Sequence, residues 1–434
     1  MALACKFGGS SVADAPQIKK VKAIVEADSS RRYIVVSAPG KRNSQDKKVT
    51  DLLYLAHETA KTGIDASEIL GLIQQRFEDI VVGLGLDFKL DEEFKLIAKN
   101  IGSESPDYAA SRGEYLNGKI IARYLGATFV DPFHHIFIDD ENMLNEEKTY
   151  PSLSRALEGS GLFLVPGFYG QGNDGKTKTF SRGGSDVTGS IVARAIRAEK
   201  YENWTDVSGL LMADPRIVHN PRCIDEVSYT ELRELSYMGA QVLHDEAIFP
   251  VRALGIPVQI RNTNQPDHLG TFIVAKVKHR VVPIVGIAGK EDFEIVYLQK
   301  ALMNKEIGFG RKLLSIFESH RISFEHLPSG IDSISVVVNS KEMAPCRQSI
   351  LKDIKKILDA DEITSFQGIA LIAVVGAGMA YHPGIAATIF TALSQEGINV
   401  RLIDQGASEL NIIIGVENPD FKGAINAIYK AFIK

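Results

Sequence analysis

The residues from Lys6 to Ser11 have the composition of a phosphate-binding turn. They read Lys-Phe-Gly-Gly-Ser-Ser and stand between a short apolar run, residues 2–5, and an amphipathic pattern, residues 12–25, which predicts a strand, a turn and a helix. The lysine then lies at the carboxyl end of the strand. The glycines let backbone amides approach a ligand, and either serine can cap a helix whose N-terminus favours an anion. On its own, the stretch also fits an ordinary turn.

A second stretch of this kind occupies residues 181–186, which read Ser-Arg-Gly-Gly-Ser-Asp. A predicted hairpin, residues 168–180, precedes it, and the helical pattern that follows could be capped by Ser185 or Asp186. Arg182 adds a guanidinium group, which can hold a carboxylate or a phosphate through two bonds. An arginine beside two glycines is also common in solvated turns, so both interpretations stay open.

Three further stretches place polar residues at the ends of predicted elements. The β-branched run at 33–38 reads as a buried parallel strand, so Ser37 would lie at the same sheet edge as the first glycine turn. Glu114 would lie in the first turn of a helix that follows residues 111–113. After a predicted strand at 201–205 come Asp206 and an Asp-Pro-Arg sequence ending at Arg216, which fits either a nucleotide site or an ordinary loop.

Composition sets the class of protein that must position these residues. The chain has 434 residues, of which 45% are hydrophobic and 24% charged, so we expect a globular protein of two or three domains. The net charge of −5, without long blocks of one sign, argues against a nucleic-acid or anionic-membrane partner. The three cysteines lack metal-ligand spacing, and the longest uncharged apolar run, residues 369–380, is too short to span a bilayer. We therefore expect a cytoplasmic protein.

The chain beyond about residue 280 contains an internal repeat. Gly308 aligns with Gly384, an offset of 76 residues (384 − 308), and residues 336–338 then align with 412–414. Each copy reads as strand, glycine loop, amphipathic helix, strand, turn and strand. The copies either enlarge the core or form a duplicated small-ligand sensor.

Together these stretches resemble the aspartate kinases of the amino acid kinase family along essentially the whole chain. Residues 6–11 match the Lys-Phe-Gly-Gly-(Thr/Ser)-Ser motif, residues 181–186 match Arg-Gly-Gly-Ser-Asp, and residues 204–216 match Trp-Thr-Asp-Val-x-Gly running to Asp-Pro-Arg. Residues 239–244 match a further signature of the family, and the repeats resemble ACT domains. The order and spacing of the motifs are more specific than any one of them.

The resemblance implies an α/β fold. It is the amino acid kinase fold, a parallel-rich central sheet sandwiched by helices, followed by two ferredoxin-like α+β ACT domains. We expect the catalytic domain at 1–280, with a helical insertion at about 61–125, and a regulatory region at 281–434, with repeat units at about 294–340 and 370–416. ACT domains of this family pair across subunits and can exchange terminal segments, which implies a homodimer or a dimer of dimers. The chain stops soon after the second copy, so we expect a monofunctional kinase.

The implied reaction is ATP-dependent phosphorylation of the β-carboxylate of L-aspartate, giving 4-phospho-L-aspartate and ADP, the first step towards lysine, threonine and methionine. A carboxylate is already a nucleophile at neutral pH, so the enzyme must align two anions and neutralise charge on the moving phosphoryl group. Lys6 and Asp186 are the implied catalytic residues: Lys6 supplies the charge, and Asp186 orients Lys6 or the waters of a Mg²⁺ ion bridging the phosphates.

The resemblance also assigns binding residues. Arg182 would hold the α-carboxylate of aspartate and Glu114 its ammonium group. The full set for the substrate is Ser37, Thr50, Glu114, Arg182 and Ser185, and the set for the nucleotide is Gly8, Gly9, Ser10, Gly183, Gly184, Thr205, Asp206 and Arg216.

An amino-acid effector is implied in the first ACT domain. Its contacts would be Met303, Gly308, Phe309, Gly310, Ser323 and Glu325. Glu325 would pair with a cationic amine, which favours lysine as the feedback inhibitor. The effector would act by binding a less active arrangement more tightly, and so shift the population.

Three positions depart from the family pattern: Ser181 replaces a glycine, Leu211 a tyrosine and Gln241 a lysine. They bear on nucleotide affinity rather than on phosphoryl transfer. One alternative is another amino acid kinase, acting on N-acetylglutamate, glutamate or a nucleoside monophosphate, against which the length, the helical insertion and the ACT pair weigh. The other is a catalytically silent amino-acid sensor, which is opposed by the retention of Lys6, Glu114, Arg182 and Asp186.

Overall fold

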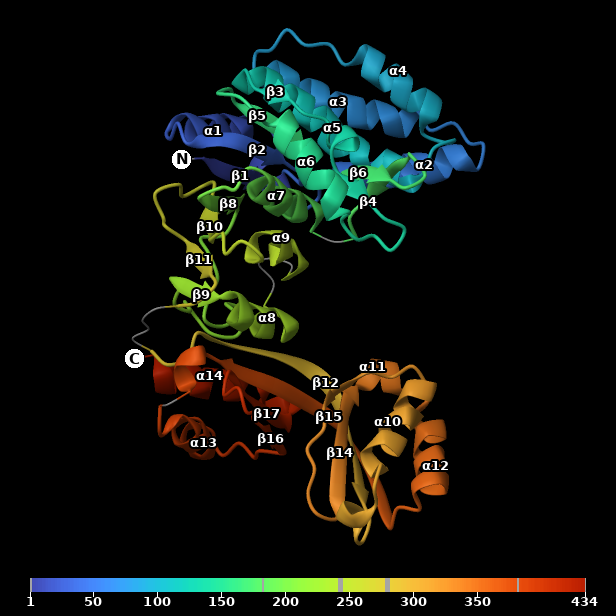
Figure 1. The fold of residues 1–434 in the computed structure, drawn as a ribbon, viewed down its shortest axis with the longest axis vertical. Helices are drawn as coiled ribbons and strands as arrows, with labels where there is room; N and C mark the ends of the chain where they lie inside the picture. Colours follow the sequence, from blue (N-terminus) through green and yellow to red (C-terminus); the bar gives the residue numbers. More distant parts are fainter. Residues whose placement is uncertain (1, 182, 241–244, 278–281, 381, 434) are drawn as a thin grey trace. The chain divides into compact units, whose positions relative to one another are not determined.

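The computed structural model describes residues 2–181, 183–240, 245–277, 282–380 and 382–433. The chain divides into two compact units, whose elements are labelled in Figure 1. The first unit comprises Met1–Leu210, Cys223–Leu232 and Gln241–Val277, and the second comprises Leu211–Arg222, Arg233–Ala240 and Lys278–Lys434. The single boundary expected at residue 280 is therefore too simple as a description of compact units, because two earlier segments group with the C-terminal region.

The first unit is built on a parallel-rich sheet, as predicted. Among the described residues this sheet has eight strands in the order β3-β5-β2-β1-β8-β10-β11-β9, and only the β10–β11 pair is antiparallel. The strands are β1 (Leu3–Phe7), β2 (Arg31–Val36), β3 (Thr128–Phe129), β5 (Phe163–Pro166), β8 (Lys200–Thr205), β9 (Glu226–Ser228), β10 (Val258–Asn262) and β11 (Thr271–Val274). A small sheet, β4 (Phe137–Ile138), β6 (Tyr169–Gly172) and β7 (Thr177–Thr179), contains the predicted hairpin.

Helices cover both faces of the large sheet. One face packs against five helices through an apolar cluster that includes Cys5, Phe7 and Ile34: α1 (Ala15–Glu26), α2 (Val49–Lys61), α3 (Ser67–Gly83), α4 (Asp91–Asn100) and α5 (Pro106–Leu125). The other face carries α7 (Gly184–Ala195), with α6 (Glu146–Ala156) beside it. Gly189 of α7 lies so close to β8 that a Cβ there would stand 2.3 Å from the Tyr201 hydroxyl. The expected helical insertion corresponds to α3, α4 and α5.

Local sequence explains why these elements form. Every residue of β1 is buried, as a central parallel strand requires. Helix α1 begins where Asp14 accepts a hydrogen bond from the Gln17 amide and Pro16 occupies the first turn. Its buried residues follow the helical period that the sequence showed. The predicted cap at Ser10 or Ser11 is wrong, because those residues lie in a short 3-10 turn, η1 (Gly9–Val12), ahead of the helix.

The second unit is an antiparallel α+β structure. Its described strands form a six-stranded sheet in the order β13-β14-β12-β15-β17-β16. They are β12 (Gly286–Gln299), β13 (Phe324–His326), β14 (Ser333–Asn339), β15 (Glu362–Val375), β16 (Leu402–Asp404) and β17 (Asn411–Glu417). The helices are α10 (Phe309–Ser319), α11 (Ser340–Met343), α12 (Arg347–Leu358), α13 (Ile385–Gln395) and α14 (Phe421–Phe432).

Strands β12 and β15 each serve two ferredoxin-like halves. Both have 14 residues, and they pair antiparallel from Gly286 opposite Val375 to Gln299 opposite Glu362. The late part of β12 and the early part of β15 complete one half with β13 and β14, and the remaining parts complete the other with β16 and β17. The ladder is irregular near Asp292 and Gly368, which have φ of 69° and 72°. The second half thus takes a strand from a segment that precedes the first repeat unit predicted at 294–340.

Segments from earlier in the chain join this unit through specific contacts. The Ile287 amide of β12 donates to the Met212 carbonyl at 2.7 Å, and the Arg222 amide donates to the Tyr429 hydroxyl at 2.8 Å. Asn411 donates to Glu234, which lies in the later part of α8 (Tyr229–Tyr237), at 2.7 Å. Helix α8 therefore begins among the residues of the first unit and ends among those of the second.

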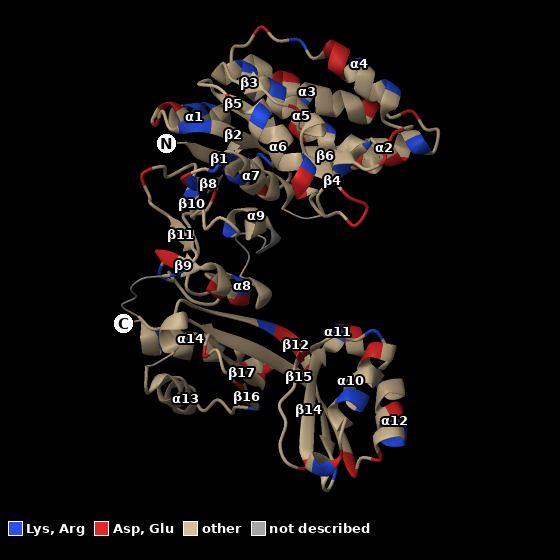
Figure 2. Cartoon of the chain, in the orientation of Figure 1, with Lys and Arg blue, Asp and Glu red and all other residues tan. Residues whose placement is uncertain are grey.

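Charge is spread over both units. Figure 2 shows Lys and Arg interspersed with Asp and Glu along the elements, including the middle of β12. Across the described ranges, no helix combines the length and apolarity needed to cross a membrane.

Candidate active site

The two glycine stretches meet at the carboxyl ends of β1 and β8. Lys6 Nζ lies 2.5 Å from Asp186 Oδ1, and the two side chains are 8% and 19% exposed. Asp186 stands in the first turn of α7, whose N-cap is Gly183 with φ of 57°. Glycine favours this left-handed conformation, and the predicted cap at Ser185 or Asp186 is therefore wrong. A cation and an anion from sequence-distant turns form one ion pair.

Backbone hydrogen bonds fix the first turn on the sheet. The Gly8 amide donates to the Trp204 carbonyl at 2.9 Å. Gly9 accepts a hydrogen bond from the Gly40 amide at 2.9 Å, and a Cβ on Gly40 would stand 2.6 Å from the Gly9 carbonyl carbon. Ser10 lies beside them in η1 and is half-buried. The close approach of these two backbones requires glycine at residue 40.

Ser37 lies at this edge of the sheet, where the sequence placed it. Its amide donates to the Phe7 carbonyl at 3.2 Å, and its carbonyl accepts from Asn117 Nδ2 at 2.8 Å. Asn117 is fully buried on α5 and was missed by the sequence reasoning, which treated that helix by its apolar period alone. The loop after β2 is thus held by both a strand and a helix.

Glu114 is a buried acid in the middle of α5, not in its first turn as predicted. The helix begins earlier, at Pro106, where Ser105 accepts from the Tyr108 amide. Glu114 is 5% exposed, and its Oε2 atom has no hydrogen-bond partner among the described residues. Burial raises the pKa of Glu114 to about 8, although the Ala38 amide donates to it. The carboxylate is therefore suited to receive a cation.

Thr50 and Ser185 lie at helix starts close to these groups. Thr50 is the second residue of α2, next to Val49, whose side chain lies 3.6 Å from the position of a Cβ on Gly113. Ser185 packs against Gly167, where an added Cβ would stand 2.7 Å from the Ser185 Cβ. Arg182, Gln241 and residues 242–244 lie outside the described residues.

The residues predicted for the nucleotide fall in both units. Thr205 ends β8 and donates to Asp206 Oδ1 at 3.1 Å, while Gly184 packs against Phe168 so tightly that a Cβ would stand 2.5 Å from its ring. Arg216 belongs to the second unit, where it is 85% exposed and paired with Asp214 at 2.5 Å. The Arg216 guanidinium is thus already paired with a carboxylate at the surface of that unit.

Strand β8 carries a further residue that touches the ion pair. Asn203 Nδ2 donates to Asp186 Oδ1 at 2.8 Å, and the Tyr201 hydroxyl donates to the Asp186 carbonyl at 3.2 Å. Asn203 is 3% exposed. The sequence signal for Asn203 is a polar residue in the middle of a buried strand, and this residue lies outside the family motifs.

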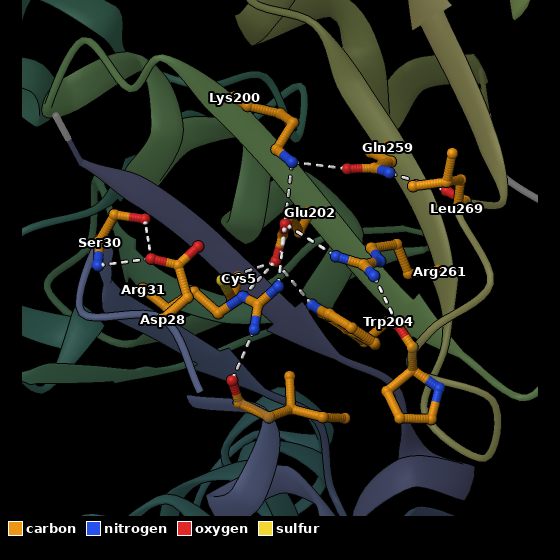
Figure 3. Close-up of polar contacts among 12 residues, drawn as sticks. Cys5, Asp28, Ser30, Arg31, Lys200, Glu202, Trp204, Gln259, Arg261 and Leu269 are labelled. Carbon is orange, nitrogen blue, oxygen red and sulfur yellow. Dashed lines mark hydrogen bonds and ion pairs between the residues drawn. The ribbon is translucent and has the colours of Figure 1, made fainter. Parts of the chain in front are cut away.

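The opposite face of β8 holds a buried ionic cluster centred on Glu202, which Figure 3 shows. This fully buried carboxylate accepts from Arg31 at 2.8 Å and from Trp204 Nε1 at 3.1 Å, and Lys200 Nζ lies 3.0 Å away. Burial opposes the charged form, but the hydrogen bonds and positive charges of Arg31 and Lys200 outweigh it and lower the pKa of Glu202. Trp204 in turn stacks on Phe7 with ring centroids 5.9 Å apart. The cluster therefore holds β1, β2 and β8 together on the face of the sheet opposite the Lys6–Asp186 pair.

The predicted effector residues lie in the first half of the second unit. Met303 and Phe309 belong to its apolar core, Gly308 is the N-cap of α10 with φ of 82°, and Gly310 follows in that helix. Ser323 is exposed beside β13, and Glu325 within it accepts a hydrogen bond from the Tyr237 hydroxyl. Gly384, the repeat partner of Gly308, is likewise the N-cap of α13 with φ of 95°.

Comparisons with known proteins agree with the motifs. The amino acid kinase family model matches residues 1–262, and an ACT domain model matches residues 372–432. Aspartokinase 3 of Bacillus subtilis is 41% identical over 443 residues, covering 98% of each chain. The aspartate kinase of Clostridium acetobutylicum, described as allosteric, is 50% identical over 99% of each chain, with a TM-score of 0.91.

A more distant structure bears on ligands. Aspartokinase III of E. coli is 25% identical over the whole of both chains and was solved with aspartate and ADP in an R-state, TM-score 0.76, and with lysine and aspartate in a T-state, TM-score 0.74.

Proposed function

Since this chain belongs to the aspartokinases of the amino acid kinase family, we propose that it transfers the terminal phosphoryl group of ATP to the β-carboxylate of L-aspartate. The observation that carries the proposal is the Lys6–Asp186 pair, held between two glycine turns at the carboxyl ends of parallel strands. The products would be 4-phospho-L-aspartate and ADP, at the start of lysine, threonine and methionine synthesis.

The reaction requires alignment of the two anionic substrates and positive charge at the phosphoryl group, rather than a strong base. Lys6, oriented by Asp186, would contact the transferring phosphoryl group, whose negative charge it neutralises. Gly9, with Gly183 and Gly184, would bring backbone amides close to the phosphate oxygens. Gly8, whose own amide donates to the Trp204 carbonyl, would belong to the same nucleotide site as part of the turn. Ser10, Thr205, Asp206 and Arg216 complete the proposed nucleotide site.

Aspartate would be held by the groups around the end of β2. The Glu114 carboxyl group, whose Oε2 atom has no hydrogen-bond partner among the described residues, is our choice for its ammonium group. Ser37 and Thr50 are our choices for hydrogen bonds to its side chain. Ser185, in the first turn of α7, belongs to the same proposed substrate site. Arg182 remains our proposal for the α-carboxylate on the sequence motif.

We propose ATP with Mg²⁺ as the nucleotide complex, supported by the ADP bound to aspartokinase III of E. coli. The described residues contain no cluster of three or more His, Cys, Asp or Glu that could hold a metal ion. Mg²⁺ is commonly held by one or two carboxylates and the nucleotide phosphates, and Asp186 offers a partly exposed carboxylate. When bound, the ion would neutralise phosphate charge.

The decisive test is a coupled assay of ADP release with aspartate, glutamate or N-acetylglutamate, combined with hydroxylamine trapping of the acyl phosphate. We expect turnover with aspartate and a trapped hydroxamate. Turnover with another acceptor alone would assign the chain to a different amino acid kinase activity, and no turnover with any of them would favour a silent sensor.

We also propose feedback inhibition by lysine through the first ACT domain and assembly as a homodimer or a dimer of dimers. Glu325 would pair with the effector's amine, and the lysine bound to aspartokinase III of E. coli in its T-state supports this choice. Separate titrations with lysine, threonine and S-adenosylmethionine would identify the effector, and light scattering would give the assembly's mass.

A further inference from the structure

Asn203 is a buried amide in the central sheet whose role the proposed mechanism leaves open. It stands directly opposite Lys6 in the register of β1 and β8, and both side chains reach the same atom, Asp186 Oδ1, at 2.8 Å and 2.5 Å. The carboxylate therefore receives one charged and one neutral donor from adjacent strands.

This arrangement follows from the alternation of side chains along β8, which point in turn to the two faces of the sheet. Tyr201 and Asn203 point to the α7 face, where they hold the Asp186 carbonyl and carboxylate. Glu202 and Trp204 point to the other face, into the cluster shown in Figure 3. Buried ion pairs anchor that face, and they fix the strand from which Asn203 reaches Asp186.

Lys6 must present an N–H to the phosphoryl group in a fixed position, and its ammonium group has three donors, so it can bond to Asp186 and to a phosphate oxygen together. If the lysine were the only donor to Asp186, the position of this largely buried carboxylate would depend on the group that it orients. The Asn203 amide bonds to the same oxygen and is neutral, so it can hold the carboxylate without competing for the phosphoryl group.

We propose that Asn203 is a positioning residue for phosphoryl transfer, which fixes the Asp186 carboxylate so that it orients Lys6 towards the phosphoryl group. This inference rests on the proposed roles of Lys6 and Asp186. It concerns a residue outside the glycine motifs.

The first test is Asn203→Leu, which keeps the side chain's size and removes the donor. We expect kcat to fall about ten- to one-hundredfold, the range for a hydrogen bond to a charged group, with KM for ATP and aspartate changed less than threefold. The matched control is Gln259→Leu, an equally buried amide of β10 that bonds to Lys200 and the Leu269 carbonyl on the opposite face. A kcat within twofold of wild type, or an equal loss in the control, would overturn the proposal.

The second test is Asn203→Asp, which keeps the size and polarity should the leucine variant fold poorly. Two adjacent carboxyl groups raise the pKa of one of them, and the introduced group can donate to Asp186 only while protonated. We expect the ratio of variant to wild-type kcat to fall as the pH rises from about 5.5 to about 8.5. A ratio that is constant or rises with pH would contradict the role. Wild-type turnover with aspartate in the same assay separates failure of the proposed function from failure of this inference.

Discussion

Lys6 is neutralised by Asp186 in this structure, yet its proposed task is at the phosphoryl group. A single lysine placed on the developing charge of a transition state contributes several kcal/mol, so its removal should affect the chemical step far more than binding.

We expect Lys6→Ala to lower kcat by at least about a hundredfold while the fold stays intact. Steady-state kinetics and circular dichroism would measure the two effects. Lys20→Ala is the matched control, because that exposed lysine of the same unit contacts Asn264 and not the site. An active Lys6→Ala variant would remove this residue from the mechanism.

Glu114 makes the stability of the free protein depend on pH. Its folded-state pKa of about 8 lies above the ordinary glutamate value of 4.5, so the folded chain retains a proton that the unfolded chain releases. Stability must then fall as the pH rises from about 4.5 to about 8. The same ionisation prepares the carboxylate for the substrate's ammonium group.

We expect Glu114→Gln to raise the melting temperature relative to wild type by more at pH 8.5 than at pH 5.5, because glutamine has no charge to desolvate. The variant should also raise KM for aspartate at least tenfold. Calorimetry and kinetics at both pH values test this; an equal melting difference at both would show that Glu114 does not titrate in this window.

At the scale of elements, the helical insertion holds the substrate loop. Arg76 of α3 is 6% exposed and donates to the Ala13 carbonyl at 3.1 Å and to the Gly40 carbonyl at 2.7 Å, and it also pairs with Asp46. Gly40 in turn contacts Gly9 of the phosphate turn. One buried cation thus joins the loop after β2 to the turn after β1.

We expect Arg76→Met to lower kcat over KM for aspartate about tenfold or more and to reduce stability by about 3 kcal/mol, because it leaves Asp46 without its buried partner. Asp46→Asn should give a smaller loss. Arg42→Met is the matched control, since this more exposed arginine pairs with the same carboxylate. Kinetics and urea unfolding would rank the three variants by kcat over KM and by stability. Losses in Arg42→Met as large as those in Arg76→Met would show that Arg76 has no special role in holding the loop.

Elements were predictable from the sequence where the signal was local. The buried run of β2, the apolar period of α1 and the hairpin before α7 follow from neighbouring residues. The apolar positions after Gly113 placed the predicted start of α5 too late in the chain, although Ser105 and Pro106 form a standard N-terminal cap. Asn203 and Asn117 were missed because their partners, Asp186 and the Ser37 carbonyl, are distant in the sequence.

At the scale of the whole molecule, the proposed effector site is already occupied by a side chain of the protein. Tyr237, at the end of α8, donates to Glu325, and burial together with this carboxylate raises the pKa of Tyr237 to about 12. An effector amine that binds the same oxygen of Glu325 would compete with the tyrosine hydroxyl.

We expect Tyr237→Phe to lower the lysine concentration for half-inhibition about fivefold, because the competing hydrogen bond is lost. Glu325→Ala should instead weaken inhibition at least tenfold without abolishing turnover. Tyr297→Phe, which alters a tyrosine contacting Gln299 in the same unit, is the control. Lysine titrations of the three variants decide the matter, and unchanged inhibition in Glu325→Ala would exclude this residue from the site.

The arrangement of the regulatory sheet was less predictable than its repeat. The offset of 76 residues correctly aligned the glycine N-caps of α10 and α13 (384 − 308). The repeat could not show that β12 and β15 each extend through both halves. Pairs such as Gly286 with Val375 join residues far apart in the sequence, so no short-range pattern marks them.

The shared strand β12 also separates the order of synthesis from the order of folding. Residues 286–290 leave the ribosome before any other strand of the sheet, yet their described ladder partners, residues 371–375, follow α10, β13, β14, α11 and α12 in the chain. Until then this segment has an open edge, the kind of surface on which nascent chains misassemble. The first part of the first strand synthesised therefore stays unpaired until β15 has been made.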